Sequence, residues 1–389
     1  ASWHYATIDS IQSRTARACS IVCHPCGAVR TSTRSGNLQD SWIRKITLVG
    51  SKLVSIPVQN RITKAVASGL LIAFAGFTSA TQGLDLQGHR GARGLMPENT
   101  LPAFAQALAI GVTTLELDLA VTSDSQVVVS HNPRLEPEIA RSPNGEWLMQ
   151  SSPPIHTMTL AVVKSYDVGR LNPASEYAER YPGQRPVDGT SVPTLGEVFE
   201  LVNRSGSQSV RFNIETKINP QRPQLTFPPG RFVRAVIDVV RRYEMEDRVA
   251  IQSFDWRALK EVQDLAPEIT TSYLTVNQRW MSNLQTGING SSPWLNGLDV
   301  DNYGGSAAHA IKAAGGDAWS PFHREVDAES IKRAQELGLS VHVWAVNETS
   351  RMRELIAMGV DGIITDYPDR LRRVMSKLGL PLPSSAPMN

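Results

Sequence analysis

An alternation of short apolar runs with amphipathic stretches along residues 84–378 constrains the fold more than any other feature of this sequence. The apolar runs predict eight strands, at residues 84–88, 114–121, 210–216, 249–254, 270–275, 318–321, 340–346 and 362–365, besides a short hairpin arm at 126–130. The amphipathic stretches predict helices at residues 97–110, 194–203, 231–243, 256–265, 307–314, 328–337, 350–358 and 368–378. Strict alternation is typical of a parallel sheet, and eight strand–helix units indicate a closed (β/α)8 TIM barrel of the α/β class. A doubly wound open sheet is the alternative architecture.

Two stretches interrupt this alternation. Residues 132–192 are rich in Pro, Ser, Gly, Tyr and Arg and carry no repeated strand pattern. About sixty residues are too long for a simple loop in a compact domain, so we expect an inserted subdomain or lid after the second strand unit. Residues 276–306 form a second irregular stretch, and the whole of 84–380 is expected to be one barrel domain.

Composition and charge exclude several classes of protein. Hydrophobic residues make up 41% and charged residues 20% of the chain, which excludes disordered, collagen-like and coiled-coil proteins. No run approaches 18 consecutive apolar residues, which excludes a multi-span membrane protein. Residues 1–83 carry nine Lys and Arg against Asp9 and Asp40, whereas the rest carries 30 basic and 35 acidic residues. The main body is therefore weakly acidic, and no nucleic-acid partner is expected.

Residues 1–57 show little periodicity, and we expect them to be non-structural, or to precede a true translation start near Val58. All three cysteines, Cys19, Cys23 and Cys26, lie in this segment. The spacing of Cys23 and Cys26 is that of half a zinc or redox site. No second pair completes it and no strand–helix–strand pattern surrounds it, so we expect no such site there.

Residues 58–80 have the pattern of a signal peptide. Arg61 and Lys64 precede a 13-residue apolar run at 65–77, and the small residues 78–80 follow it. A membrane anchor is the alternative, but thirteen helical residues span only about 20 Å, too short for a bilayer core. We therefore expect cleavage after Ala80 and export to the periplasm or the medium. The mature protein would have no stable membrane span and no disulfide bond.

Polar side chains gather where the expected strands end, which is where barrel enzymes place their chemistry. Glu116 and Asp118 are two residues apart on one strand, so they share a face, and Glu215 ends the next barrel strand. Two such charges about 4 Å apart repel by ~4 kcal/mol at an effective dielectric near 20. A proton or a cation must relieve this repulsion. All-oxygen ligands favour a hard divalent ion, Mg²⁺ or Ca²⁺, over zinc.

Two histidines and two cations accompany these acids. His89 and His131 follow strand ends, and imidazole suits acid/base catalysis because it is half-charged near neutral pH. Arg90 and Lys217 stand where an anion would enter. This combination fits a phosphodiester, whose anionic oxygens the cations and a metal would hold while the histidines move protons.

These residues occur in an ordered set of motifs that resembles the glycerophosphodiester phosphodiesterase family over residues 84–375. The motifs are Gly88-His89-Arg90-Gly91, Pro97-Glu98-Asn99-Thr100, Glu116-Leu117-Asp118, His131, Glu215-Thr216-Lys217, Trp344-Ala345-Val346-Asn347 and Asp361-Gly362-Ile363-Ile364-Thr365-Asp366-Tyr367-Pro368. The resemblance implies a barrel with a small insertion, and hydrolysis of glycerophosphodiesters to an alcohol and sn-glycerol 3-phosphate. It departs from the family at Asn132, where Asp is frequent, at Ala345, where Thr is frequent, and in a longer insertion.

The resemblance also implies roles for individual residues. His89 and His131 become the acid/base pair, and Glu116, Asp118 and Glu215 the metal ligands. Contacts to the phosphate and the rest of the substrate fall to Arg90, Lys217 and Trp344. The supporting residues are Glu98, Asn99, Gln252, Phe254 and Asp366.

Two other functions remain open from the residues alone. Lys217 could form a Schiff base in an aldolase-like barrel, although neighbouring carboxylates would keep its amine protonated. A non-catalytic exported protein could use the same pocket to bind a phosphodiester. In each case the expected partner is a small molecule.

Overall fold

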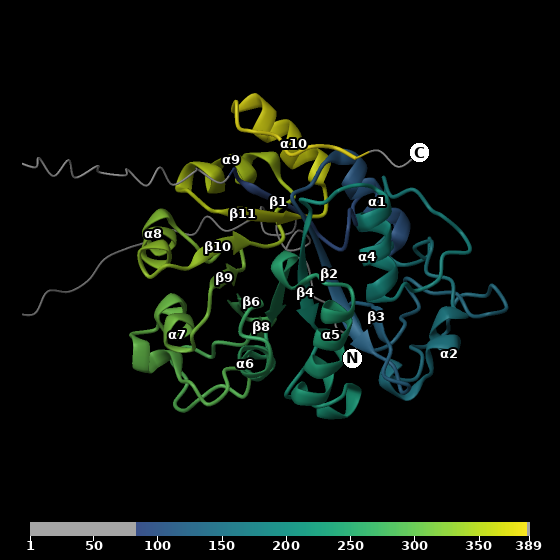
Figure 1. Ribbon diagram of the computed structural model, residues 1–389, viewed down its shortest axis with the longest axis horizontal. Coiled ribbons are helices and arrows are strands. Elements are labelled where there is room, and N and C mark those ends of the chain that lie inside the picture. Colours follow the sequence, from purple (N-terminus) through teal and green to yellow (C-terminus); the bar gives the residue numbers. More distant parts are fainter. Residues whose placement is uncertain (1–82, 387–389) are drawn as a thin grey trace, which may run out of the picture. The chain divides into compact units, whose positions relative to one another are not determined.

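The computed structural model describes residues 83–386, in which eight parallel strands close into a barrel (Figure 1). In their order around the barrel, the strands are β1 (Asp85–Gly88), β2 (Thr114–Val121), β4 (Arg211–Thr216), β5 (Val249–Ser253), β6 (Thr270–Thr275), β9 (Ala318–Pro321), β10 (Ser340–Val343) and β11 (Gly362–Thr365). The barrel closes because β1 pairs with both β11 and β2. This closure confirms the TIM barrel and rules out the open sheet. The expectations for residues 1–57 and 58–80 lie outside the described residues.

Each barrel strand is followed by a helix that packs on the outside of the barrel (Figure 1). These helices are α1 (Leu101–Ile110), α4 (Leu195–Arg204), α5 (Pro229–Arg242), α6 (Trp256–Leu265), α7 (Ala307–Ala313), α8 (Ala328–Glu336), α9 (Thr349–Met358) and α10 (Pro368–Lys377). Helix α5 shows why they form, since Phe232, Val236 and Val240 recur at helical spacing and are all buried. None of the helices in residues 83–386 has the length and apolar character that crossing a membrane requires.

Two element boundaries differ from the sequence prediction by three or more residues. Helix α1 begins at Leu101 rather than at residue 97, because Asn99 adopts a left-handed φ of 55° and Thr100 accepts the backbone N–H of Ala103 as an N-cap. The expected strand 340–346 ends as β10 at Val343, after which Trp344 forms only an isolated bridge. Both differences lie at the carboxyl end of the barrel, where side chains turn toward the site.

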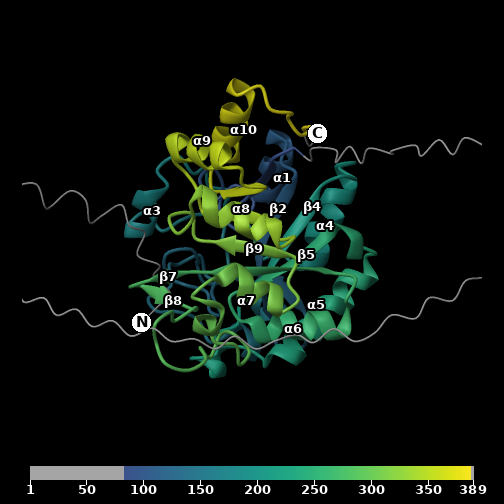
Figure 2. The ribbon, with the colours of Figure 1, turned by 90° about the vertical axis from the view of Figure 1, so that its left-hand side faces the viewer.

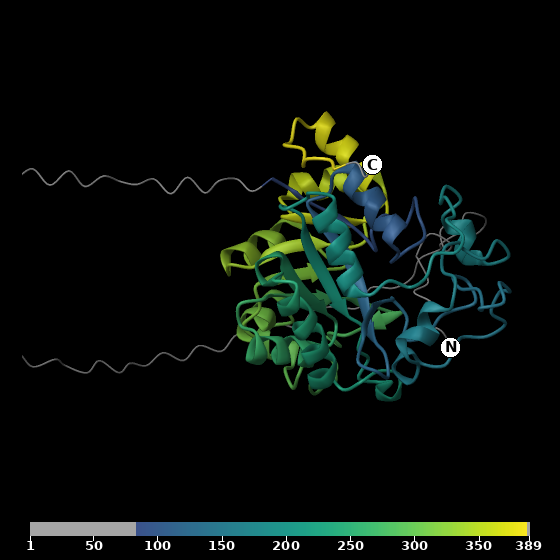
Figure 3. The same cartoon turned by 45° about the vertical axis from the view of Figure 1, so that its right-hand side comes forward.

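The inserted segment 132–192 follows β3 (Val127–Val129), an antiparallel partner of β2, and comes forward on the right in Figure 3. Its regular structure is limited to the 3₁₀ turn Ile155–Thr157 and the short helices α2 (Leu160–Lys164) and α3 (Glu176–Arg180). It nevertheless has a buried hydrophobic cluster, which consists of Ala120, Val128, Leu135, Ala140, Ile155, Met158, Val163, Val168 and Val192. Because Ala120 belongs to the barrel strand β2 and Val128 to its partner β3, the insertion packs directly on the barrel.

The second irregular stretch, 276–306, contains a small hairpin of β7 (Asn277–Gln278) and β8 (Met281–Ser282). The 3₁₀ turn Val300–Tyr303 precedes α7, and two more 3₁₀ turns occur at Pro223–Leu225 and Glu246–Arg248. Figure 2 shows α3 and the β7–β8 hairpin at the same end of the barrel. This is the end at which the strands finish and the candidate site lies.

The two faces of the barrel strands differ in chemistry. Leu86, Leu117 and Ile214 are completely buried between the strands and the helices. The residues that alternate with them, such as Gln87 and Asn213, point into the barrel and hydrogen-bond to each other across it. The interior of this barrel is thus partly polar, and its polar residues lead up to the site.

Candidate active site

Three buried carboxylates meet at the carboxyl end of the barrel. Glu116 and Asp118 come from β2, and Glu215 comes from the neighbouring strand β4, in register with Asp118. One oxygen of each lies within 4.8 Å of the others, the only such group of potential metal ligands in residues 83–386. The alternation of β2 and the pairing of β2 with β4 therefore bring together the three acids that the sequence marks.

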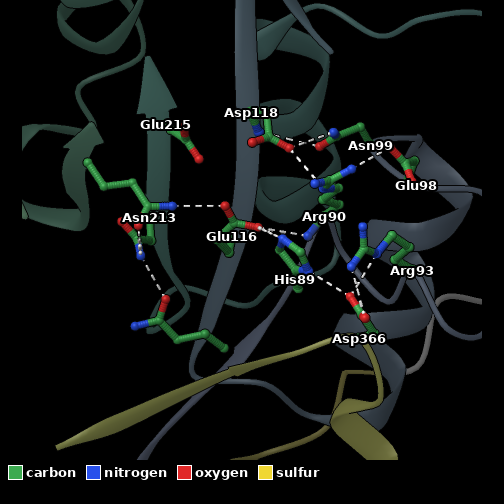
Figure 4. Close-up of polar contacts among 12 residues, drawn as sticks. His89, Arg90, Arg93, Glu98, Asn99, Glu116, Asp118, Asn213, Glu215 and Asp366 are labelled. Atoms are coloured by element: carbon green, nitrogen blue, oxygen red, sulfur yellow. Dashed lines mark hydrogen bonds and ion pairs between the residues drawn. The ribbon is translucent and has the colours of Figure 1, made fainter. Parts of the chain in front are cut away.

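Hydrogen bonds fix the orientation of two of these carboxylates (Figure 4). Glu116 Oε2 accepts the backbone N–H of Arg90 at 2.8 Å, and its Oε1 accepts Gln252 Nε2 at 2.8 Å. Asp118 Oδ2 accepts Asn99 Nδ2 at 2.9 Å. The left-handed conformation of Asn99 and the late start of α1 place this amide over the site.

Two cations flank the carboxylates. The Arg90 guanidinium lies between Glu98, at 2.7 Å, and Asp118, at 3.2 Å. Lys217 Nζ lies 2.8 Å from Glu215 and 3.7 Å from Asp118. Burial opposes ionisation of Asp118, but the nearby His131, Arg90 and Lys217 outweigh it and hold the pKa of Asp118 below its usual range. Asp118 is therefore ionised at neutral pH.

The cations do not relieve all of the repulsion in the cluster. Burial and the charge of Asp118 raise the pKa of Glu116 well above its usual value. The pKa of Glu215 rises to about 7 through burial and Asp118, even though Lys217 lowers it. Glu116 and Glu215 thus resist ionisation even though Arg90 and Lys217 lie beside them. A further cation at this site would stabilise their charged forms. Because every donor is a carboxylate oxygen, the set fits a hard divalent ion.

His89 follows β1 and is held by a carboxylate. Its Nδ1–H donates to Asp366 Oδ1 at 2.6 Å, and its Nε2 lies 3.8 Å from Glu116 Oε2. Burial and the charge of Arg93 lower the pKa of His89 to about 4, despite the opposing effect of Asp366. Arg93 also binds both oxygens of Asp366, at 2.8 and 2.9 Å, and Asn347 Nδ2 donates to Asp366 at 2.7 Å. His89 is thus a neutral imidazole in a fixed orientation.

His131 follows β3 and has a different partner. Its Nδ1 lies 2.7 Å from the side-chain oxygen of Asn132, a neutral amide. Burial, followed by the charges of Arg90 and Lys217, lowers the pKa of His131 well below its usual value. The electrostatic interaction of His131 with Asp118 places it beside the acidic cluster.

Aromatic side chains border the site near Lys217. The Lys217 ammonium lies 5.9 Å from the centre of the Phe254 ring. Phe254 in turn packs edge-to-face on Trp344, with ring centres 5.4 Å apart. Trp344 is held by its Nε1–H, which donates to the carbonyl oxygen of Ser320 at 2.9 Å. Phe254 and Trp344, which the sequence analysis names as site residues, therefore lie together beside Lys217, just after the ends of β5 and β10.

Four residues of the site were missed as site residues by the sequence analysis: Arg93, Tyr177, Tyr181 and Asn347. Tyr177, on α3 of the insertion, donates its hydroxyl to Glu98 and accepts from Arg93 at 3.3 Å. Tyr181, which follows α3, donates to Asp366 at 3.4 Å. Asn347 stands in a quoted motif, but nothing in the pattern of the insertion marks the two tyrosines. The insertion thus contacts the groups that hold both Arg90 and His89.

Comparisons with known proteins agree with this geometry. Residues 89–370 match the model of the Glycerophosphoryl diester phosphodiesterase family. The chain is 29% identical over 291 residues to a glycerophosphodiester phosphodiesterase of Caldanaerobacter subterraneus, covering 75% of this chain and 97% of that protein. It is 38% identical to a crystal structure of a candidate glycerophosphoryl diester phosphodiesterase from Silicibacter pomeroyi, with a TM-score of 0.68, covering 77% of this chain and 95% of that one.

A phosphodiesterase of Oleispira antarctica, solved with the product sn-glycerol-3-phosphate, shares the fold at 20% identity and a TM-score of 0.54, over 75% of this chain and 96% of that one. The family match spans every motif from His89 to Asp366, in one continuous stretch. These findings confirm the resemblance noted in the sequence. This chain belongs to the glycerophosphoryl diester phosphodiesterase family.

Proposed function

We propose that this protein is a divalent-metal-dependent glycerophosphodiester phosphodiesterase, which hydrolyses its substrates to an alcohol and sn-glycerol 3-phosphate. The observation that carries the proposal is the meeting of three buried carboxylates with two histidines and two cations at one end of the barrel. Family membership supports this reading of the site.

Glu116, Asp118 and Glu215 are the residues that would hold the metal, with Mg²⁺ or Ca²⁺ as the ions that best suit carboxylate ligands. When bound, such an ion supplies a Lewis acid for a phosphoryl oxygen. Arg90 and Lys217 are placed to bind the anionic oxygens of the diester, Arg90 as a planar fork and Lys217 as a point charge.

We assign the proton transfers from the partners of the two histidines. His89 is neutral, and the Asp366 carboxylate on its Nδ1 stabilises the positive charge that a base gains. It therefore takes the proton of the nucleophile, which is water or the 2-hydroxyl of the glycerol group; the latter would give a cyclic intermediate. His131 is held at Nδ1 by the Asn132 amide, and burial with the charges of Arg90 and Lys217 outweighs the charge of Asp118 and lowers its pKa. It therefore takes up a proton from solvent before the step, and as a strong acid it then gives this proton to the leaving alcohol.

The test is coupled detection of glycerol 3-phosphate from a panel of diesters, with and without chelator. We expect chelation to abolish turnover and Mg²⁺ or Ca²⁺ to restore it. Glu215→Gln should weaken metal affinity, whereas Glu329→Gln, at an exposed glutamate on α8, should not. Full activity in excess chelator, with no metal in the purified protein, would contradict the metal-dependent mechanism. Release of no glycerol 3-phosphate from any diester would contradict the activity.

We also propose that the protein is exported. The basic, apolar and small-residue parts of 58–80 support this, and cleavage after Ala80 would leave every described element intact because β1 begins only at Asp85. N-terminal sequencing of exported protein should begin at Thr81 or within a few residues. A mature protein that keeps residues 65–77 would instead be anchored.

A further inference from the structure

A column of buried amides crosses the interior of the barrel beneath the site. Gln87 Nε2 donates to Asp85 Oδ2 at 2.9 Å, and Gln87 Oε1 accepts Asn213 Nδ2 at 2.9 Å. Asn213 Nδ2 also donates to Gln252 Oε1 at 3.1 Å, and Gln252 Nε2 donates to Glu116 Oε1 at 2.8 Å. The column thus joins a carboxylate near the amino end of β1 to a carboxylate of the acidic cluster.

The bonds of the column run in one direction on each side of Asn213. Gln87 turns its NH₂ group toward Asp85 and Gln252 turns its own toward Glu116, and each turns its carbonyl inward. Both carbonyls then face Asn213, whose NH₂ group has two hydrogens and donates one to each. Asn213 Oδ1 is buried and has no hydrogen-bond partner among residues 83–386. The column therefore uses Asn213 as a double donor.

The lower end of the column is firmly held. Asp85 Oδ1 accepts the hydroxyl of Thr114 at 2.7 Å, and Asp85 Oδ2 lies 3.1 Å from the guanidinium of Arg211. At the upper end Asn213 is in register with Glu116 on the adjacent strand, yet it reaches that carboxylate only through Gln252. A change at Asn213 can thus alter Glu116 without touching it.

We propose that Gln87, Asn213 and Gln252 are positioning residues, and that Asn213 sets the direction in which the Gln252 amide faces Glu116. With its N–H toward Glu116, Gln252 fixes one carboxylate oxygen while the Arg90 backbone fixes the other. With the amide reversed, a carbonyl oxygen would face the carboxylate. The inference rests on the proposed function, because it treats Glu116 as a metal ligand.

The test is a double-mutant cycle in the full chain with Asn213→Leu and Gln252→Met, which keep side-chain size but cannot hydrogen-bond. Mg²⁺ affinity is measured by calorimetry, and thermal unfolding is measured without metal. We expect each single variant to bind Mg²⁺ about 10- to 100-fold more weakly, the range for lost outer-shell partners. The double variant should bind no more weakly than Gln252→Met. KM at saturating metal should change much less than the Mg²⁺ dissociation constant.

The control is Ser272→Ala, which removes another buried interior hydrogen bond, to Ser320 at 2.8 Å, outside the column. It should leave Mg²⁺ affinity unchanged. The proposal would be overturned if Asn213→Leu weakened Mg²⁺ binding by the same factor in the wild-type protein and in Gln252→Met. It would also be overturned if Asn213→Leu lowered the unfolding temperature but left Mg²⁺ affinity unchanged.

A wild-type measurement covers the case in which a variant does not fold. Mg²⁺ should shift the side-chain NH₂ resonances of Gln252 and Asn213 more than those of exposed amides, and no shift at either would overturn the inference. Wild-type protein that binds Mg²⁺ but releases no glycerol 3-phosphate would contradict the proposed activity alone. Protein that binds no divalent ion would overturn both proposals.

Discussion

At the scale of single residues, His89 and His131 differ in what holds their Nδ1 atoms, a carboxylate in one case and an amide in the other. The acid matters most when the leaving alcohol is poor, as in glycerophosphocholine, and little when a phenolate leaves. We therefore expect His131→Ala to lose roughly 10²–10⁴ in kcat/KM on natural diesters but much less on bis(p-nitrophenyl) phosphate. His89→Ala should lose comparably on both substrates.

The control for this pair is His309→Ala, at an exposed histidine on α7, which should change neither rate. If His89→Ala, rather than His131→Ala, lost much less on bis(p-nitrophenyl) phosphate than on natural diesters, His89 would be the acid and His131 the base. If either His89→Ala or His131→Ala leaves glycerophosphocholine turnover unchanged, that histidine is structural and the two-histidine mechanism is wrong.

The site residues that could be predicted from the sequence are those whose position follows from strand geometry. Glu116, Asp118 and Glu215 meet because alternate residues share a face and parallel strands end at one mouth. Tyr177 and Arg93 could not be found this way. Tyr177 reaches Glu98 across 79 residues from a segment without periodicity, and the role of Arg93 depends on Asp366 at the far end of the chain.

At the scale of elements, the insertion 132–192 is held by a core that it shares with the barrel. Val163 and Val162 are neighbours on α2, but Val163 is completely buried in that core whereas Val162 is 45% exposed. Val163→Ala should therefore lower the free energy of unfolding by ~1.5–3 kcal/mol, the loss of two buried methyl groups plus a cavity. The matched Val162→Ala should stay within ~0.5 kcal/mol.

Urea unfolding followed by near-UV circular dichroism measures both changes. A single transition that shifts for Val163→Ala would show that the insertion and the barrel unfold together. A separate early transition, with the main one unmoved, would make the insertion an independent lid instead.

Element types follow well from periodicity here, but their ends do not. The expected helix start at residue 97 was early by four residues, although Thr100 is an N-cap residue that could have marked it. No residue of the sequence marks the end of β10, because residues 344–346 are as apolar as the strand before them. In the structure they leave the sheet after Val343, and Trp344 forms only an isolated bridge.

At the scale of the whole molecule, the number of strand–helix units predicted closure, but the polar interior beneath the site could not be foreseen from periodicity. Gln87 and Asn213 each look like an ordinary polar residue of a strand, and their meeting requires the barrel to close across β2. That polar interior has a consequence for acid stability. Asp85 lies in it near the amino end of β1, buried beside His342 and Arg211.

Burial opposes ionisation of Asp85, but His342, Arg211 and two threonine hydroxyls outweigh it and lower the pKa of Asp85 below its usual 3.8. A carboxyl whose folded pKa is lowered adds stability above its unfolded pKa and loses it as the pH falls through the folded value. Asp85→Asn should therefore reduce the free energy of unfolding most above about pH 5, and the gap to wild type should narrow toward pH 3. Urea titrations at pH 3–7 measure this gap, with Asp264→Asn, an exposed residue on α6, as the matched control. A gap that stays constant from pH 7 to pH 3 would mean that Asp85 stabilises the barrel through hydrogen bonds alone and that its charge contributes nothing.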